Sequence, residues 1–384
     1  MGRHLAPKGC VASHDPIQTG RVTALAEQIL AAPVGVALLG RLEARHYLVP
    51  FDWSPAGAGS AVVTARSSDT GEPESHPIPW EVPDGTSPAS VDDAVRDART
   101  MPLGELLAVA VGAGYSSAGP WSGSSQIELR RAYRDAPKRV AIAGAVAARF
   151  EDVPAGTRHE WWHSDHAARD YFGVRRLVNH DDSLYGNGEL TYAGVRTLTD
   201  PPQAAHQALS TAWEIYPDPI SRWRLPVRDG ARVFEINEPS DWVELVMAYP
   251  TVPTRPNTAW ELPGANDHNR DPALDPASAG RAARNAIDHI AMPTWSRVAR
   301  DYDGVHLTWR GWLTTEGFIS DTPDGGVTWM RYWFSEQTLW LNDVFGEPEP
   351  LSAPTFQYEQ GVDVMTDDAR RSQDREVLRA MLGR

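Results

Sequence analysis

The segment RVFEINEPSDWVELVMAYP, residues 232–250, places a strand directly before a helix. Residues 232–236 follow the alternation that is typical of a strand. Pro239, Ser240 and Asp241 then predict the first turn of a helix, which ends at Pro250. Apolar residues recur along one face of this helix: Trp242, Leu245, Val246 and Tyr249. We therefore expect this face to pack on the preceding strand.

Helix and strand signals alternate downstream of this segment. The expected elements are a helix over residues 293–300 and strands over residues 305–313, 328–334 and 338–341. In the strand of residues 305–313, His306, Thr308 and Arg310 would share one face, because side chains alternate along a strand. The short strands between turn signals predict an antiparallel or mixed sheet.

Helical spacing dominates the chain up to about residue 155. The expected helices begin near Arg21 and at Pro33, and run over residues 90–99, 102–111 and 125–150. The Gly- and Ser-rich residues 112–119 do not fit the Gly-x-Gly-x-x-Gly pattern of a phosphate-binding turn. We expect them to form a flexible loop between helices.

These patterns predict an α+β fold, in which a mainly helical N-terminal region is followed by an α+β domain with an antiparallel or mixed sheet. A chain of 384 residues is long enough for about two domains. The predicted organisation is a flexible tail over residues 1–20, a mainly helical domain over 21–155, a Trp-rich α+β domain over 156–345, and a linker with a C-terminal helix over 346–384.

Two strings of residues resemble a pattern found in uncharacterised actinobacterial proteins. They are residues 232–249 and the string DYDGVHLT, residues 301–308. The resemblance spans roughly residues 232–343, under a third of the chain, and implies no activity. The scarcity of lysine, which occurs only as Lys8 and Lys138, agrees with a GC-rich genome.

Composition limits the classes of partner. The formal net charge is -15, and an acidic chain repels phosphates, so nonspecific nucleic-acid binding is not expected. The lone cysteine, Cys10, excludes an internal disulfide and a cysteine-based zinc site. The sequence shows no hydrophobic leader and no apolar run of about 18 residues, so we expect a cytoplasmic location without membrane contact.

The sharpest motif is HEWWH, residues 159–163, which fits H-E-x-x-H. On a helix, His159 and His163 would share one face and bind one zinc ion, and Glu160 would be the general base on zinc-bound water. His166 falls on the same helical face and is a candidate third ligand. Other candidates are His180, Asp181, Asp182 and Glu189. The motif predicts a metal-dependent hydrolase with zinc as its cofactor.

A second constellation lies on the expected sheet: Arg232, His306, Thr308, Arg310 and Glu336. A basic residue, a hydroxyl and a glutamate on neighbouring strands are similar to the active site of mono-ADP-ribosyltransferases. The resemblance implies that such residues hold NAD and stabilise an oxocarbenium-like state. That family has E-x-E or Q-x-E before an aliphatic pair, whereas Thr338 stands here in place of the second acid. The key catalytic carboxylate of the family is therefore missing.

Fifteen tryptophans, twelve of them between Trp161 and Trp340, offer a third basis for function. They could form stacking platforms for bases or sugars, but the face that Trp309 is expected to share with apolar neighbours favours burial. Three classes of function stay open: a zinc hydrolase, an NAD-using transferase, and a non-catalytic protein that binds a partner through its Trp-rich surface or residues 253–280.

Overall fold

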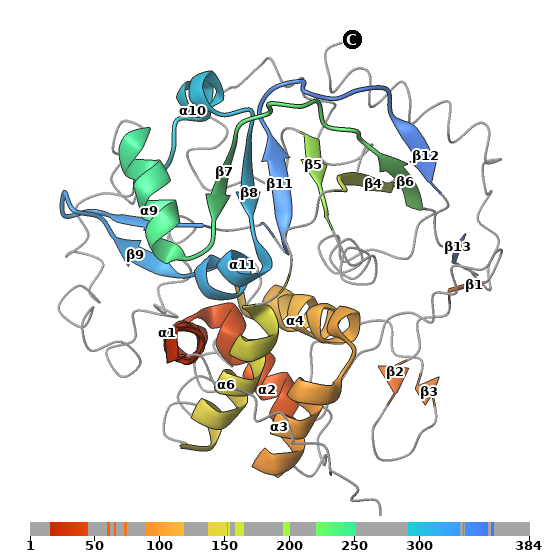
Figure 1. Ribbon diagram of the computed structural model, residues 1–384, viewed down its shortest axis with the longest axis vertical. Coiled ribbons are helices and arrows are strands. Elements are labelled where there is room, and N and C mark those ends of the chain that lie inside the picture. Colours follow the sequence, from red (N-terminus) through yellow and green to blue (C-terminus); the bar gives the residue numbers. More distant parts are fainter. Residues whose placement is uncertain are drawn as a thin grey trace, which may run out of the picture.

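The computed structural model describes residues 16–44, 60–61, 65–66, 73–74, 90–118, 137–151, 153, 158–164, 195–199, 220–250, 291–330, 333, 335–351 and 355–356. These residues form helices together with small antiparallel and mixed sheets (Figure 1). The described chain therefore has the α+β content that the sequence predicts.

Five described helices precede β4 in the chain and gather on one side of the sheets (Figure 1). They are α1 (Pro16–Ala31), α2 (Pro33–Ala44), α3 (Val91–Thr100), α4 (Leu103–Ala118) and α6 (Pro137–Phe150). The helical spacing of Val22, Leu25 and Ile29 in α1 and of Leu38, Leu39 and Leu42 in α2 predicts buried faces; Val22 is half-buried, and the other five residues are fully buried. Ser90 caps α3 by accepting a hydrogen bond from the backbone N of Asp93 at 3.1 Å. The helices predicted in these segments are confirmed where the structure describes them; residues 125–136 of the helix expected over 125–150 lie outside the described residues.

A four-stranded mixed sheet contains His306 and Glu235. Its order is β5 (Val195–Thr197), β11 (Gln337–Trp340), β8 (Gly304–Leu307) and β7 (Val233–Ile236). β7 and β8 are parallel, and the other two pairs are antiparallel. The register places Glu235 of β7 and Thr338 of β11 on either side of His306 in β8.

The remaining strands form smaller sheets. β4 (Glu160–Ser164), β6 (Ile220–Arg224) and β12 (Glu349–Leu351) make an antiparallel sheet in the order β12-β6-β4. Three two-stranded pairs complete the set: β9 (Ile319–Asp321) with β10 (Val327–Trp329), β1 (Ser60–Ala61) with β13 (Thr355–Phe356), and β2 (Ala65–Arg66) with β3 (Pro73–Glu74).

The predicted strand–helix unit is confirmed as β7 followed by α9 (Pro239–Ala248). The carboxylate of Asp241 accepts hydrogen bonds from the backbone N of Asn237 at 2.7 Å and of Glu238 at 3.1 Å, which satisfies two donors at the start of the helix. Of the expected stripe, Trp242, Leu245 and Val246 are fully buried, and Tyr249 is half-buried against the same core. Trp242 also donates from its indole N to Thr328 Oγ1 at 2.9 Å.

The strand expected over residues 305–313 is wrong beyond Leu307. The chain turns at Thr308 into the helix α11 (Trp309–Thr315), which follows α10 (Trp295–Asp301) and β8. Thr308 Oγ1 accepts from Gly311 N at 3.0 Å and donates to Ile236 O at 3.1 Å. A side chain at Gly311 would collide with that same carbonyl of Ile236. The hydroxyl cap and the missing Cβ together end the strand and start the helix.

The loop expected over residues 112–119 is also wrong, because α4 continues to Ala118. The close approach of α11 explains the glycine at position 114. A Cβ built there would lie 2.5 Å from Trp312 Cζ2. The glycine at position 114 is therefore explained by tight helix packing.

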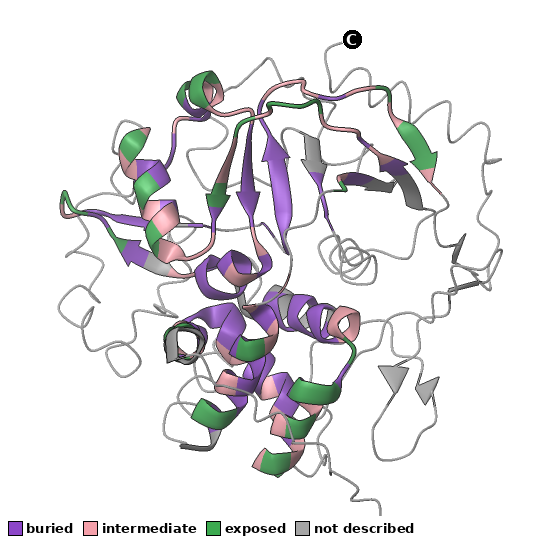
Figure 2. Cartoon of the chain, viewed as in Figure 1, coloured by how far each residue is buried: buried purple, intermediate pink, exposed green. Residues whose placement is uncertain are grey.

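One continuous apolar cluster joins the two halves of the fold. It contains buried residues of α1, α2, α4 and α6 together with Trp242 of α9, Val305 of β8 and Trp312 of α11. Figure 2 shows α11 buried between the helices and the four-stranded sheet. A smaller cluster lies under β4 and β6 and is made of Trp161, Trp223, Leu225, Trp340 and Phe345.

The tryptophans whose burial is described are all core residues. Their exposed fractions do not exceed 5% at Trp161, Trp223, Trp242, Trp295, Trp309, Trp312, Trp333 and Trp340. The preference for burial over surface stacking is confirmed at these eight positions. In the part of the chain that the structure describes, no single helix is long and apolar enough to span a membrane, and α1 and α2 pass that test only as a pair bent by 92°.

The packing of α4 on α11 yields a test with an internal control. Gly114→Ala should lower the free energy of unfolding by about 1–3 kcal/mol, because the new methyl group forces Trp312 or the helix to move. Gly144→Ala in α6 should raise it by about 0.5–1 kcal/mol, since a Cβ there meets nothing within 4 Å. Urea unfolding of both variants measures the difference. Equal stability of the two would contradict the close packing.

Candidate functional site

The HEWWH motif does not lie on a helix, so the helical zinc site is wrong. Glu160–Ser164 form β4, whose backbone pairs with β6 so that Trp161 faces Trp223 and His163 faces Ser221. Residues four apart in a strand are separated by about 13 Å, and their side chains stand perpendicular to it. The extended backbone of residues 160–164 therefore does not give the helical face that the predicted zinc site requires. His166 and the other candidate ligands, His180, Asp181, Asp182 and Glu189, lie outside the described residues.

His159 has a different environment from a metal ligand. Its Nδ1 lies 3.1 Å from Thr197 Oγ1, and its ring meets Trp340 edge-on at 5.1 Å. Trp340 donates to the same Thr197 oxygen at 2.8 Å, so the threonine hydrogen is left to donate to a neutral imidazole. Burial, together with the nearby charge of His306, lowers the pKa of His159 to about 4.

The motif's acid, Glu160, is buried with an exposed fraction of 6%. It lies at the paired edge of β4, where its backbone exchanges hydrogen bonds with Leu198. Within the described ranges no group of three or more His, Cys, Asp or Glu side chains is placed to hold a metal ion.

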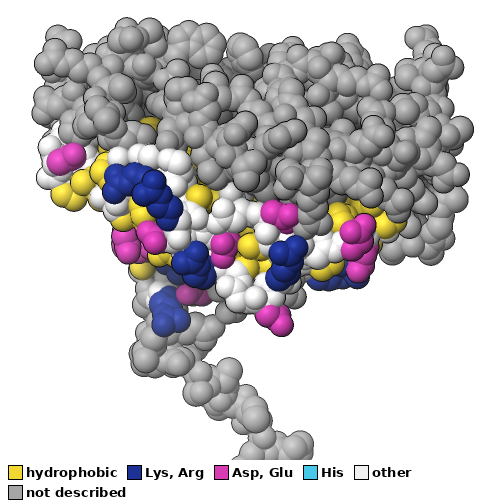
Figure 3. Space-filling view, turned by 90° about the horizontal axis from the view of Figure 1, so that it is seen from above, with side chains coloured by type: hydrophobic (Ala, Val, Ile, Leu, Met, Phe, Trp, Pro, Cys, Tyr) yellow, Lys and Arg dark blue, Asp and Glu magenta, His cyan; other side chains and the backbone are white. Residues whose placement is uncertain are grey.

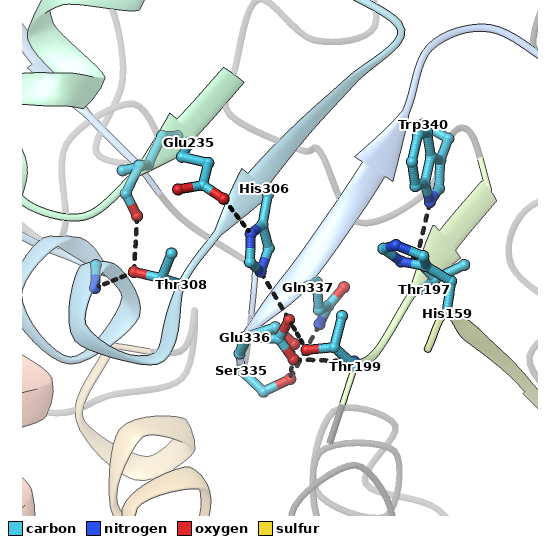
Figure 4. Close-up of polar contacts among 12 residues, drawn as sticks. His159, Thr197, Thr199, Glu235, His306, Thr308, Ser335, Glu336, Gln337 and Trp340 are labelled. Carbon is cyan, nitrogen blue, oxygen red and sulfur yellow. Dashed lines mark hydrogen bonds and ion pairs between the residues drawn. The ribbon is translucent and has the colours of Figure 1, made fainter. Parts of the chain in front are cut away.

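The second predicted constellation centres on His306 (Figure 4). His306 Nε2 lies 2.8 Å from Glu336 Oε1, and His306 Nδ1 lies 3.6 Å from Glu235 Oε1. Burial opposes a charge on the ring, but the contacts with Glu235 and Glu336 outweigh it and raise the pKa of His306 to about 9. The imidazole is thus held as a cation between two carboxylates.

Glu235, His306 and Glu336 form a row of three side chains, and Glu336 is the end of this row that is fixed by further hydrogen bonds. Thr199 donates to it twice, from its hydroxyl to Oε1 at 2.5 Å and from its backbone N to Oε2 at 3.1 Å. The carboxylate has an exposed fraction of only 2%. These contacts, added to that of His306, fix its position where β5 and β11 run side by side (Figure 4).

Glu235 is the open end of the row. Its side chain is about half exposed, and its contact with His306 is longer than a normal hydrogen bond. The neighbouring His306 lowers the pKa of Glu235, and Asn237 contributes in the same direction. At neutral pH Glu235 is therefore an ionised carboxylate that solvent and ligands can reach.

The other predicted residues divide into two groups. Thr308 and Arg310 lie beside His306, although not on one strand face: Thr308 caps α11, and Arg310 extends from that helix to Glu151 Oε2 at 3.4 Å and Glu238 Oε2 at 3.6 Å. Arg232 does not join them. It lies at the start of β7, 57% exposed, with its Nε 3.7 Å from Asp303 Oδ2.

A cavity of about 160 Å³ opens beside this row at the junction of the sheet with α6 and α11. Its polar lining is Glu151, Thr199, Glu235, Asn237, His306, Thr308, Arg310 and Glu336, and its apolar lining is Phe150, Val153 and Trp309. The structure therefore brings four of the five residues of the predicted sheet site into one pocket. Sequence reasoning missed Glu151, Thr199 and Glu235; the polar position of Glu235 in the alternation of residues 232–236 was the only local signal for them.

The surface adds little to these candidates. Figure 3 shows acidic and basic side chains interspersed over the described part of one face. Comparison of the chain with protein-family models, curated proteins and solved structures finds no match. The chemistry must therefore be argued from the pocket itself.

The two histidines predict opposite effects of pH on stability. His306 has a folded pKa above its ordinary value of 6.5, so its stabilisation is complete below pH 6.5 and is lost as the pH rises through about 9. The loss from pH 7 to 9.5 should be on the order of 2 kcal/mol. His159 has a folded pKa below 6.5, so stability falls as the pH drops from 6.5 towards 4.

Urea unfolding of the intact chain between pH 4 and 10 measures both effects. His306→Gln should flatten the alkaline limb, and His159→Gln should flatten the acidic limb. An alkaline limb that is unchanged in the His306 variant would contradict the assignment of the raised pKa to His306.

Proposed function

We propose that the chain is a hydrolase that acts on a small polar substrate by acid–base catalysis in the cavity beside His306. The observation that carries the proposal is the buried imidazolium of His306, which lies in a cavity wall between a fixed and a reachable carboxylate. Strongly shifted titratable groups in a cavity are typical of catalytic sites. A buried ion pair by itself adds little stability, so a purely structural role explains the row less well.

The geometry assigns different roles to the three side chains. Glu336, held by Thr199, orients His306 through Nε2 and stabilises its charge, as the third member of a catalytic triad does. His306 Nδ1 carries the loosely held proton, because its contact with Glu235 is 3.6 Å long. Glu235 is ionised and is the carboxylate at the open end of the row.

These roles describe one balanced reaction. Glu235 takes a proton from water as the water oxygen bonds to the substrate, and His306 gives its Nδ1 proton to the leaving group as the scissile bond breaks. The products are the two hydrolysed halves, with Glu235 protonated and His306 neutral. A single proton transfer from Glu235 to His306, which face each other across the β7–β8 pair, restores the starting state.

The other predicted functions find less support in the described residues. A zinc hydrolase centred on the HEWWH motif needs a helix where β4 lies. An ADP-ribosyltransferase-like site needs Arg232 beside Glu336, whereas Arg232 pairs with Asp303 at the far end of β7. A binding surface of stacked tryptophans needs exposed rings, and eight of the fifteen are buried.

Chromogenic substrates test the proposal. Wild-type protein should cleave at least one member of a panel of small esters, amides and glycosides with nitrophenyl or nitroanilide leaving groups. His306→Gln should lower kcat/KM by about 10²- to 10⁴-fold, the range for loss of a general acid. For the wild type, kcat/KM should fall as the pH rises through about 9, because the acid must be protonated.

Glu349→Gln is the matched control. Glu349 is an exposed glutamate of β12 that pairs with Arg224 away from the cavity, so its loss should leave kcat/KM unchanged. Activity in His306→Gln equal to that of the control, or a panel that the wild type leaves uncleaved, would refute the acid–base site.

A further inference from the structure

The cavity and its ion pairs contain more negative than positive charge. Three carboxylates line it, those of Glu151, Glu235 and Glu336, against the cations His306 and Arg310. Arg310 is also shared with Glu238, outside the lining, at 3.6 Å. Among the described residues, four carboxylates therefore share two cations.

Spare hydrogen-bonding capacity lies on two of these carboxylates and on Arg310 Nε, a buried donor for which the described residues provide no acceptor. An ionised carboxylate offers about four acceptor positions. Glu336 uses three of them on His306 and Thr199. Within the described part of the chain, Glu235 contacts His306 and Asn237, and Glu151 contacts Arg310 at 3.4 Å. Glu235 and Glu151 therefore keep acceptors for a ligand.

We propose that the cavity binds a primary ammonium group, held by the carboxylates of Glu235 and Glu151, so that the substrate of the proposed hydrolase is a small amine. This inference rests on the proposed function. An ammonium group has three N–H donors and no acceptor, which matches carboxylates whose acceptors are unused. Its charge also offsets part of the negative excess, which a neutral hydroxyl group does not.

The apolar part of the lining would contact the hydrocarbon part of the amine. Phe150 and Trp309 are almost fully buried, and together with Val153 they form the apolar part of the cavity lining. This wall suits a short hydrocarbon segment. The volume of about 160 Å³ is below the 300–1,000 Å³ that is usual for drug-sized ligands, so the segment is short.

A series of ligands of equal size isolates the effect of charge. Propylammonium, n-propanol and propionate are titrated into the whole chain at pH 7 and low salt, with binding followed by calorimetry and by chemical-shift changes. Propylammonium should bind at least tenfold more tightly than propanol, and propionate should bind most weakly. Salt should weaken propylammonium binding, because the interaction is between charges.

Variants connect the affinity to the two carboxylates. Glu235→Gln and Glu151→Gln should each weaken propylammonium binding about tenfold, whereas Glu349→Gln should not change it. Circular dichroism checks that each variant is folded, and either carboxylate variant suffices if the other is not. Propanol binding as tightly as propylammonium, or unchanged affinity in a folded variant, overturns the ammonium site.

The two proposals fail in different ways. Tight propylammonium binding without turnover of any chromogenic substrate removes the hydrolase and supports the ammonium site. Turnover that depends on His306, combined with equal binding of propanol and propylammonium, supports the hydrolase and removes the ammonium site.

Discussion

The close contact between Gly311 and the carbonyl oxygen of Ile236 is the constraint on which the rest of the fold depends. It lets the first turn of α11, which follows β8 in the chain, lie against the end of the neighbouring strand β7. Thr308 completes the junction by donating a hydrogen bond to the same carbonyl. Because β8 ends at this junction, His306 lies near the end of the strand, and Arg310 lies in the first turn of the helix that follows. A larger residue at position 311 would separate these two groups and the pocket between them.

α11 in turn brings the helical layer to the cavity beside His306. Trp312 packs on Gly114 of α4, and Arg310 reaches Glu151 just beyond α6. The cavity therefore has one wall from the sheet and one from the helices. A single seven-residue helix sets the distance between these walls, which makes the shape of the pocket a property of the packed core.

Local patterns predicted the elements that local chemistry determines. The strand–helix unit of residues 232–250 and the stripes of α1 and α2 follow from side-chain spacing and helix caps, so they could be read directly. The conformation of the HEWWH motif could not be predicted in this way. Two histidines four residues apart suit a helix, but the segment forms a strand through pairing with β6, where Trp161 lies opposite Trp223. His306 and Glu336 were found as polar residues of the sheet. Thr199 and Glu151, 137 and 159 residues away from their partners, leave no local trace.

The parallel pairing of β7 with β8 has a consequence for the order of folding. Glu235 and His306 are adjacent in the sheet but 71 positions apart in the chain, and Thr199 joins them from another distant segment. Contacts between remote segments carry a large loop-closure entropy and form slowly. Each helix forms through local hydrogen bonds, whereas packing between helices, such as α1 on α6, also joins remote segments. The contact between Glu235 and His306 depends on the β7–β8 pairing, so it is completed only when this non-local pairing has formed.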